Sequence, residues 1–161
     1  MPTEKPSDAM AEHRKTTKTA VRWFYLQSLV LTLILFFVHI VLIFDVAGSL
    51  LETRSWFLDH FGAHDTGKIM VLGTFLILFF AHILETVVWG MFLRWKHVVP
   101  NFLDGIYYVG ATISTLGYGD IVLNKPWRQM GALIAISGVL KFGCSTAFLF
   151  FVIQNVWSWK L

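Results

Sequence analysis

Residues 112–122, TISTLGYGDIV, place hydroxyl groups, two glycines and an acid between two strongly apolar stretches. Glycine adopts positive φ angles without steric cost, so Gly117 and Gly119 allow backbone angles that alternate in sign. Successive carbonyl oxygens then point in the same direction. A row of such oxygens is suited to holding a dehydrated cation.

The segment before this loop predicts a short helix over residues 101–114. Pro100 precedes Asn101, a favoured N-cap residue, and Asp104 follows three positions later in a capping-box arrangement. The apolar part is shorter than the roughly 20 residues that a spanning helix needs, so we expect it to enter the membrane and stop there. The negative end of such a helix faces the membrane interior, which favours a cation.

Three longer apolar runs predict the helices that position this loop, at residues 21–45, 69–93 and 128–156. Of the 161 residues, 56% are hydrophobic and 14% are charged, whereas a soluble domain carries about 25% charged residues. The first run is too long for a signal-peptide core and lacks a cleavage site after it. We therefore expect an all-α membrane protein with three transmembrane helices and a re-entrant short helix.

The remaining segments lie before and after the first span. Residues 1–20 are polar and contain two prolines, which predicts a disordered tail. In residues 46–68, apolar residues recur at helical spacing among charged ones, which predicts a short amphipathic helix on the membrane surface. Gly62 and Gly67 are expected at the turn into the second span. Residues 69–156 then form one module, with outer helix 69–93, short helix 101–114, loop 115–120 and inner helix 128–156.

The loop has a recognisable sequence, Thr115-Leu116-Gly117-Tyr118-Gly119-Asp120. With a capped short helix before it and a span on each side, it resembles the selectivity filter of potassium channels, in which carbonyl oxygens replace the ion's hydration shell. The HILE segment at 82–85 and FGCSTAF at 142–148 also resemble those of small bacterial channel-like proteins with three spans.

The resemblance implies roles for individual residues. The filter residues that present oxygen atoms to the transported K⁺ are Thr115, Leu116, Gly117, Tyr118 and Gly119. Tyr107 and Tyr108 fall where the family braces its filter tyrosine, and no organic cofactor is implied. Ala111 stands where some relatives have an acid that partners the filter aspartate. Tyr108 or solvent is therefore the expected partner of the Asp120 side chain. Because four loops encircle one ion, one loop per chain implies a homotetramer.

Three ionisable residues of the predicted spans, His82, Glu85 and Lys141, are costly at membrane depth. Counting along the helices at 1.5 Å per residue places them about 15–21 Å below the surface. An unpaired buried charge costs several kcal/mol, so we expect His82 or Glu85 to contact Lys141. Two alternatives remain: Lys141 lines the pore wall with Ser137 and Ser145, or the group forms a pH- or voltage-linked gate.

Other polar and small residues of the spans are open to two interpretations. Gly138 and Gly143 are candidate hinges of the inner helix, although close helix packing is the favoured role for each. His39 is expected to find a partner on a neighbouring helix, and a titrating histidine would be the sensor to look for.

Two indicators of membrane orientation disagree. A filter mouth at Asp120 on the outer side places the N-terminal tail outside as well. The tail and its junction with the first span carry five basic residues, against Arg54 and Lys68 in the segment that would lie inside. The positive-inside rule therefore points the other way. We follow the filter, because its orientation is tied to mechanism.

These observations predict passive, potassium-selective conduction through a homotetrameric pore in the lipid bilayer. The resemblance implies a cell membrane, and specifically a bacterial inner membrane. One alternative is a non-conducting membrane sensor or interaction protein whose pore Lys141 blocks, and another is a less selective cation channel. The sequence contains no arginine-repeat voltage sensor. It also lacks a Walker motif, a Rossmann fingerprint and a nucleophile–base constellation, so we expect no enzyme. Basic residues here mark topology, so no nucleic-acid partner is expected.

Overall fold

The computed structural model describes the backbone of residues 6–158 and the side chains of residues 19–62 and 65–158. Helix α1 spans Pro6–Trp95, α2 spans Phe102–Ile113 and α3 spans Met130–Ser158, with the 3-10 helix η1 at Trp127–Gln129 before α3. The described part contains no strand. This confirms the all-α class, which suits a bilayer because a helix satisfies its own backbone hydrogen bonds.

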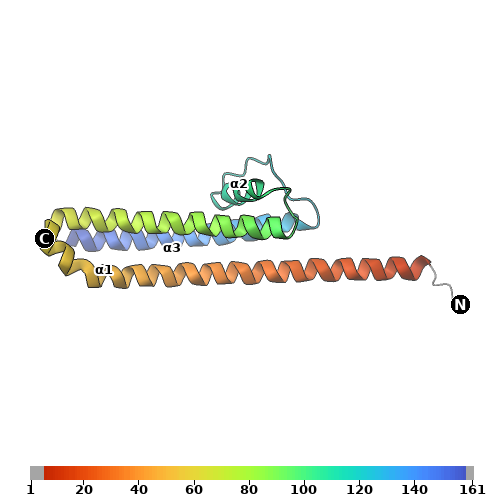
Figure 1. Ribbon diagram of the computed structural model, residues 1–161, viewed down its shortest axis with the longest axis horizontal. Helices are drawn as coiled ribbons and strands as arrows, with labels where there is room; N and C mark the ends of the chain where they lie inside the picture. Colours follow the sequence, from red (N-terminus) through yellow and green to blue (C-terminus); the bar gives the residue numbers. More distant parts are fainter. Residues whose placement is uncertain (1–5, 159–161) are drawn as a thin grey trace.

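Helix α1 folds back on itself at Gly62, where φ is 73° and ψ is 166°. Glycine adopts this positive φ without a steric penalty. The bend divides α1 into a first arm, residues 6–62, and a second arm, residues 63–95. Across it, the Thr66 hydroxyl donates a hydrogen bond to the carbonyl of Phe57 at 2.8 Å. The two arms therefore run antiparallel, with α3 alongside the second arm (Figure 1).

Among the residues that the structure describes, three helical stretches are long and apolar enough to cross a membrane, at Thr19–Gly62, Asp65–Trp95 and Trp127–Ser158. Each contains one of the three predicted spans. The fold is thus that of a multi-pass membrane protein. The predicted ends of the three spans differ from the observed ends mainly in the first helix.

The first helix corrects two predictions. Residues 6–20 are helical rather than disordered; residues 1–5 lie outside the described residues. The separate surface helix predicted over 46–68 is absent, because the first arm continues to Gly62. Pro6 occupies the start of the helix, where proline is tolerated. No proline follows before Pro100, and the tail is rich in Ala, Glu, Lys and Arg, which favour helix.

Helix α2 lies to one side of the second arm and α3, near the ends of these helices that lie away from the bend (Figure 1). At its start, a Cβ atom on Gly105 would lie 2.8 Å from the carbonyl oxygen of Gly90, in the last turns of the second arm. At its end, a Cβ on Gly138 would lie 2.7 Å from the Cβ of Ile113. Because Gly138 is about two turns inside α3, the end of α2 packs beside α3 about two turns from the start of that helix.

The main apolar core lies at this end of the bundle and joins both arms, α2 and α3. The first arm closes it from outside: the Phe24 ring lies 4.2 Å from the Trp127 ring, centroid to centroid. The Tyr25 hydroxyl donates to the carbonyl of Pro126. The start of the first span and the segment after loop 115–120 therefore lie at the same end of the bundle.

Candidate functional site

The start of α2 is held by the predicted cap. Asn101 accepts a hydrogen bond from the backbone N–H of Asp104 at 2.8 Å and donates its own amide to the Asp104 carboxylate at 2.7 Å. This pairing satisfies one of the backbone donors that a helix start leaves open. The position where α2 begins is thus set locally by two side chains.

Loop 115–120 has a backbone that alternates in the sign of φ. The angle is 60° at Thr115, 55° at Gly117 and 80° at Gly119, while Leu116 and Tyr118 are not in the positive region. The sequence indicated alternation at the two glycines but missed Thr115, because a β-branched residue rarely adopts positive φ. Strain of this kind persists only where the surrounding structure imposes it, and it is concentrated at functional sites.

Two backbone hydrogen bonds attach the loop to the end of α2. The N–H of Thr115 donates to the carbonyl of Thr112 at 3.2 Å, and that of Gly117 donates to the carbonyl of Ala111 at 3.1 Å. All residues from Ser114 to Asp120 are exposed in the single chain, and Tyr118 is 69% exposed. The loop is therefore anchored on one side and uncovered on the other.

Asp120 has a different partner from the one predicted. Its carboxylate accepts a 2.7 Å hydrogen bond from the Tyr107 hydroxyl, not from Tyr108. Adjacent helical residues point about 100° apart, and Tyr108 faces α3, where its hydroxyl lies 2.5 Å from the Cβ position of Gly131. The Tyr107 hydrogen bond lowers the pKa of Asp120 and raises the pKa of Tyr107.

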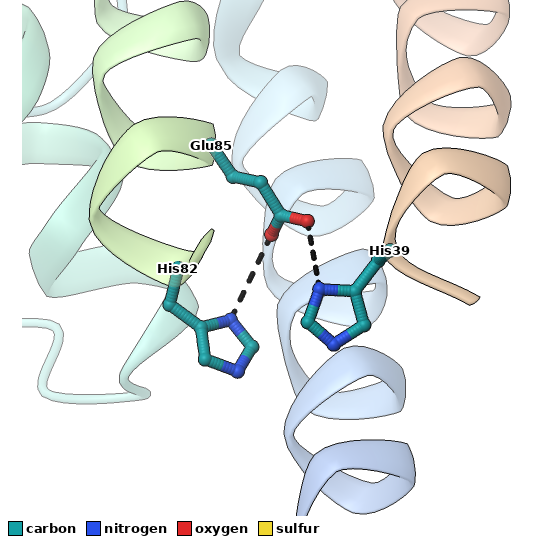
Figure 2. A group of neighbouring side chains, drawn as sticks. All are labelled: His39, His82 and Glu85. Atoms are coloured by element: carbon teal, nitrogen blue, oxygen red, sulfur yellow. Dashed lines mark hydrogen bonds and ion pairs between the residues drawn. The ribbon is translucent and has the colours of Figure 1, made fainter. Parts of the chain in front are cut away.

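The ionisable residues at membrane depth meet at Glu85, and Figure 2 shows its contacts with the two histidines. Lys141 from α3 places its Nζ atom 2.7 Å from Oε2, and His39 from the first arm places Nδ1 3.0 Å from Oε1. His82 lies farther away, with Nδ1 3.7 Å from Oε2. The structure brings Lys141 to Glu85, one of the two partners that depth counting predicted, and places His39 in the same cluster.

Ser145 completes the cluster on the opposite side of both imidazole rings. Its Oγ atom lies 2.8 Å from Nε2 of His39 and 3.1 Å from Nε2 of His82. The sequence placed Ser145 only on a polar stripe of the inner helix. A usable signal was its position one turn after Lys141, which puts both side chains on the same face of α3.

The burial of Lys141 opposes the alternative in which it lines a pore. Its side chain is 3% exposed within the single chain, whereas a pore-lining side chain of one chain is uncovered until the other chains assemble. Ser137 and Ser145, the other members of that stripe, are also buried. The stripe thus faces the protein's own interior.

His39, His82 and Glu85 have the ligand types that a divalent metal ion prefers, and their ligand atoms lie within 4.8 Å of one another. Lys141 argues against a metal ion here, because its ammonium already neutralises the Glu85 carboxylate. A divalent ion would leave two uncompensated charges in an apolar setting, which is costly. We therefore assign no metal ion to this cluster.

The two candidate hinge glycines have different surroundings. Gly138 faces Ile113 of α2 at close range, which is the packing role that the sequence favoured, whereas a Cβ on Gly143 would meet no atom within 4 Å. Helix α3 runs without interruption through both positions. A hinge at Gly143 stays a prediction.

The family described as ion channel matches residues 68–155, more than half of the chain. The chain belongs to this ion channel family. The match takes in α2, loop 115–120 and most of α3. It also contains His82, Glu85 and Lys141, so the loop and most of the Glu85 cluster of this ion channel lie within the family region. His39, in the first arm, lies outside the match. No solved structure matches the chain.

Proposed function

We propose that the protein is a potassium-selective channel that conducts passively down the electrochemical gradient. The observation that carries this proposal is the alternating sign of φ along Thr115, Leu116, Gly117, Tyr118 and Gly119. Alternation turns successive carbonyl oxygens towards one side, where they can replace the hydration shell of K⁺. The sequence TLGYGD, which resembles the potassium-channel filter, supports the same ion.

We propose a homotetramer because one chain supplies only one row of carbonyl oxygens. The exposure of residues 114–120 supports this assembly, since four copies around an axis would cover the loop's open side. The end of α2 adds its negative dipole to the same region, because loop 115–120 follows directly after that end. The proposed location is the cell membrane.

The blocked-pore alternative has no support from the position of Lys141, which is buried on Glu85 within its own chain. A less selective cation channel would use the same backbone geometry. A flux experiment is therefore needed to distinguish the potassium-selective channel from the less selective one.

The experiment measures potassium and sodium flux from liposomes that contain the purified tetramer, with barium as a blocker. We expect potassium flux to exceed sodium flux and to stop with barium. Gly117→Ala should abolish it, because alanine is strained at a φ of 55°. The matched control is Gly73→Ala, at a membrane-helix glycine with no atom within 4 Å of the added Cβ.

Each other outcome contradicts a stated part of the proposal. Equal potassium and sodium flux would favour the less selective channel. The absence of flux from a folded tetramer, over a range of pH, would favour the non-conducting sensor. Equal loss of flux in Gly117→Ala and Gly73→Ala would remove the filter assignment of Gly117.

A further inference from the structure

The hydrogen atoms of the Glu85 cluster can be placed by elimination. Nδ1 of His39 lies 3.0 Å from the Glu85 carboxylate, which only accepts, so this nitrogen must carry a hydrogen. In a neutral His39, Nε2 then has none, and it accepts from the Ser145 hydroxyl 2.8 Å away. The single hydroxyl hydrogen of Ser145 is thereby used.

The use of the Ser145 hydrogen also determines the tautomer of His82. Because Ser145 has already donated to His39, its oxygen accepts from His82, and Nε2 of His82 carries the hydrogen. Nδ1 of a neutral His82 is then bare. That bare nitrogen faces Oε2 of Glu85 at 3.7 Å, so two acceptors oppose each other without a hydrogen between them.

We propose that Nδ1 of His82 is a proton-binding site inside the membrane region of this protein. Transfer of a proton from water to this nitrogen forms an N–H bond aimed at Glu85 and gives His82 a charge of +1. At 3.7 Å this N–H and the carboxylate form a close pair of opposite charges, and two acceptors no longer oppose each other. The other three nitrogens gain no new bond from a proton in the present geometry.

Access favours His82 over His39. The side chain of His82 is 14% exposed, whereas that of His39 is 0% exposed. His82 and Ser145 line an open cavity of about 210 Å³ among mostly apolar side chains. Phe142 covers the imidazole of His82, with ring centroids 4.4 Å apart.

The bound proton acts on the contact between the second arm and α3. The titratable and charged side chains seen facing His82 are His39 from the first arm, Glu85 from its own arm and Lys141 from α3. A protonated His82 becomes a second cation beside Oε2 of Glu85, in competition with Lys141. Proton uptake therefore weakens the hold of Glu85 on α3.

The test uses the full chain with ¹⁵N-labelled histidine in lipid nanodiscs, followed by NMR from about pH 8 to about pH 5. Nitrogen shifts distinguish the two neutral tautomers from the charged ring. His82→Gln assigns the signal. The matched control is His60→Gln, at an exposed histidine of the first arm that contacts the carbonyl of Trp56.

At about pH 8 we expect hydrogen on Nδ1 of His39 and on Nε2 of His82, and on acidification we expect His82 to gain its second hydrogen first. Ser145→Ala keeps both histidines and should release His82 into a mixture of tautomers, which keeps the test open if His82→Gln fails to fold. A hydrogen on Nδ1 of His82 at high pH, earlier uptake by His39, or no uptake would overturn the proposal. Displacement of both signals by added Zn²⁺ would overturn it in favour of a metal site.

Discussion

The Nζ atom of Lys141 lies 2.7 Å from Oε2 of Glu85, and both side chains are at least nine-tenths buried. This ion pair joins α3 to the second arm inside the membrane-spanning part of the chain. A pair in this setting has a small net effect when intact, since desolvation offsets attraction, but the loss of one partner leaves a buried charge.

Replacing one partner should therefore destabilise the protein more than replacing both. We expect Lys141→Leu to cost about 3–5 kcal/mol and the double variant Lys141→Leu, Glu85→Leu to cost less. Thermal unfolding in detergent measures the difference. Lys68→Met is the matched control, because Lys68 pairs with Asp65 on the surface at 3.4 Å; such pairs contribute about 0–1 kcal/mol. A cost for Lys141→Leu no larger than that of Lys68→Met would contradict the role of the pair.

Gly138 and Gly143 should respond oppositely to alanine. In Gly138→Ala the added Cβ would lie 2.7 Å from the Cβ of Ile113, and overpacking of this kind costs about 1–3 kcal/mol. Gly143→Ala adds a methyl group in open space and should stabilise the helix by about 0.5–1 kcal/mol. Unfolding temperatures measure both. A loss in Gly138→Ala no larger than that in Gly143→Ala would argue against this contact.

The Tyr107–Asp120 hydrogen bond predicts two pH effects. The lowered pKa of Asp120 lies below 3.8, so its contribution is present above pH 3.8 and is lost as the pH falls through the lowered value. The raised pKa of Tyr107 means that its hydroxyl ionises only above pH 10.0. In Asp120→Asn, ultraviolet titration should show the pKa of one tyrosine returning towards its ordinary value. The variant Tyr107→Phe identifies which titration signal belongs to Tyr107. An unchanged titration in Asp120→Asn would exclude the bond.

The Asn101 cap predicts a small, local loss of stability. Asn101→Ala should cost about 1 kcal/mol, because the first turn of α2 loses an acceptor for a backbone N–H. Asn101→Ser supplies another capping oxygen and should stay close to the parent protein. Unfolding temperature is again the readout, and equal losses in the two variants would assign the effect to something other than capping.

Local features of this protein follow from the residue types along the chain. The three apolar runs, the Asn101 cap, the bend at Gly62 and the positive φ angles of Gly117 and Gly119 each depend on residues within one segment of the sequence. The chain's amino-acid sequence determined them because apolar length, side-chain capping and glycine's freedom act within one element. Continuity of the first arm was missed, because amphipathic spacing in residues 46–68 is also compatible with an uninterrupted helix.

The identities of the contacting partners were decided by tertiary structure alone. Depth counting places His82, Glu85 and Lys141 at a similar level, but it says nothing about how each helix is rotated about its axis. Rotation brings His39 to Glu85, 46 positions away, and to Ser145, 106 positions away. It also makes Tyr107, instead of Tyr108, the residue that donates a hydrogen bond to Asp120. The position of a residue along the helix axis follows from its place in the sequence. Which neighbouring helix its side chain faces is decided only when the helices pack.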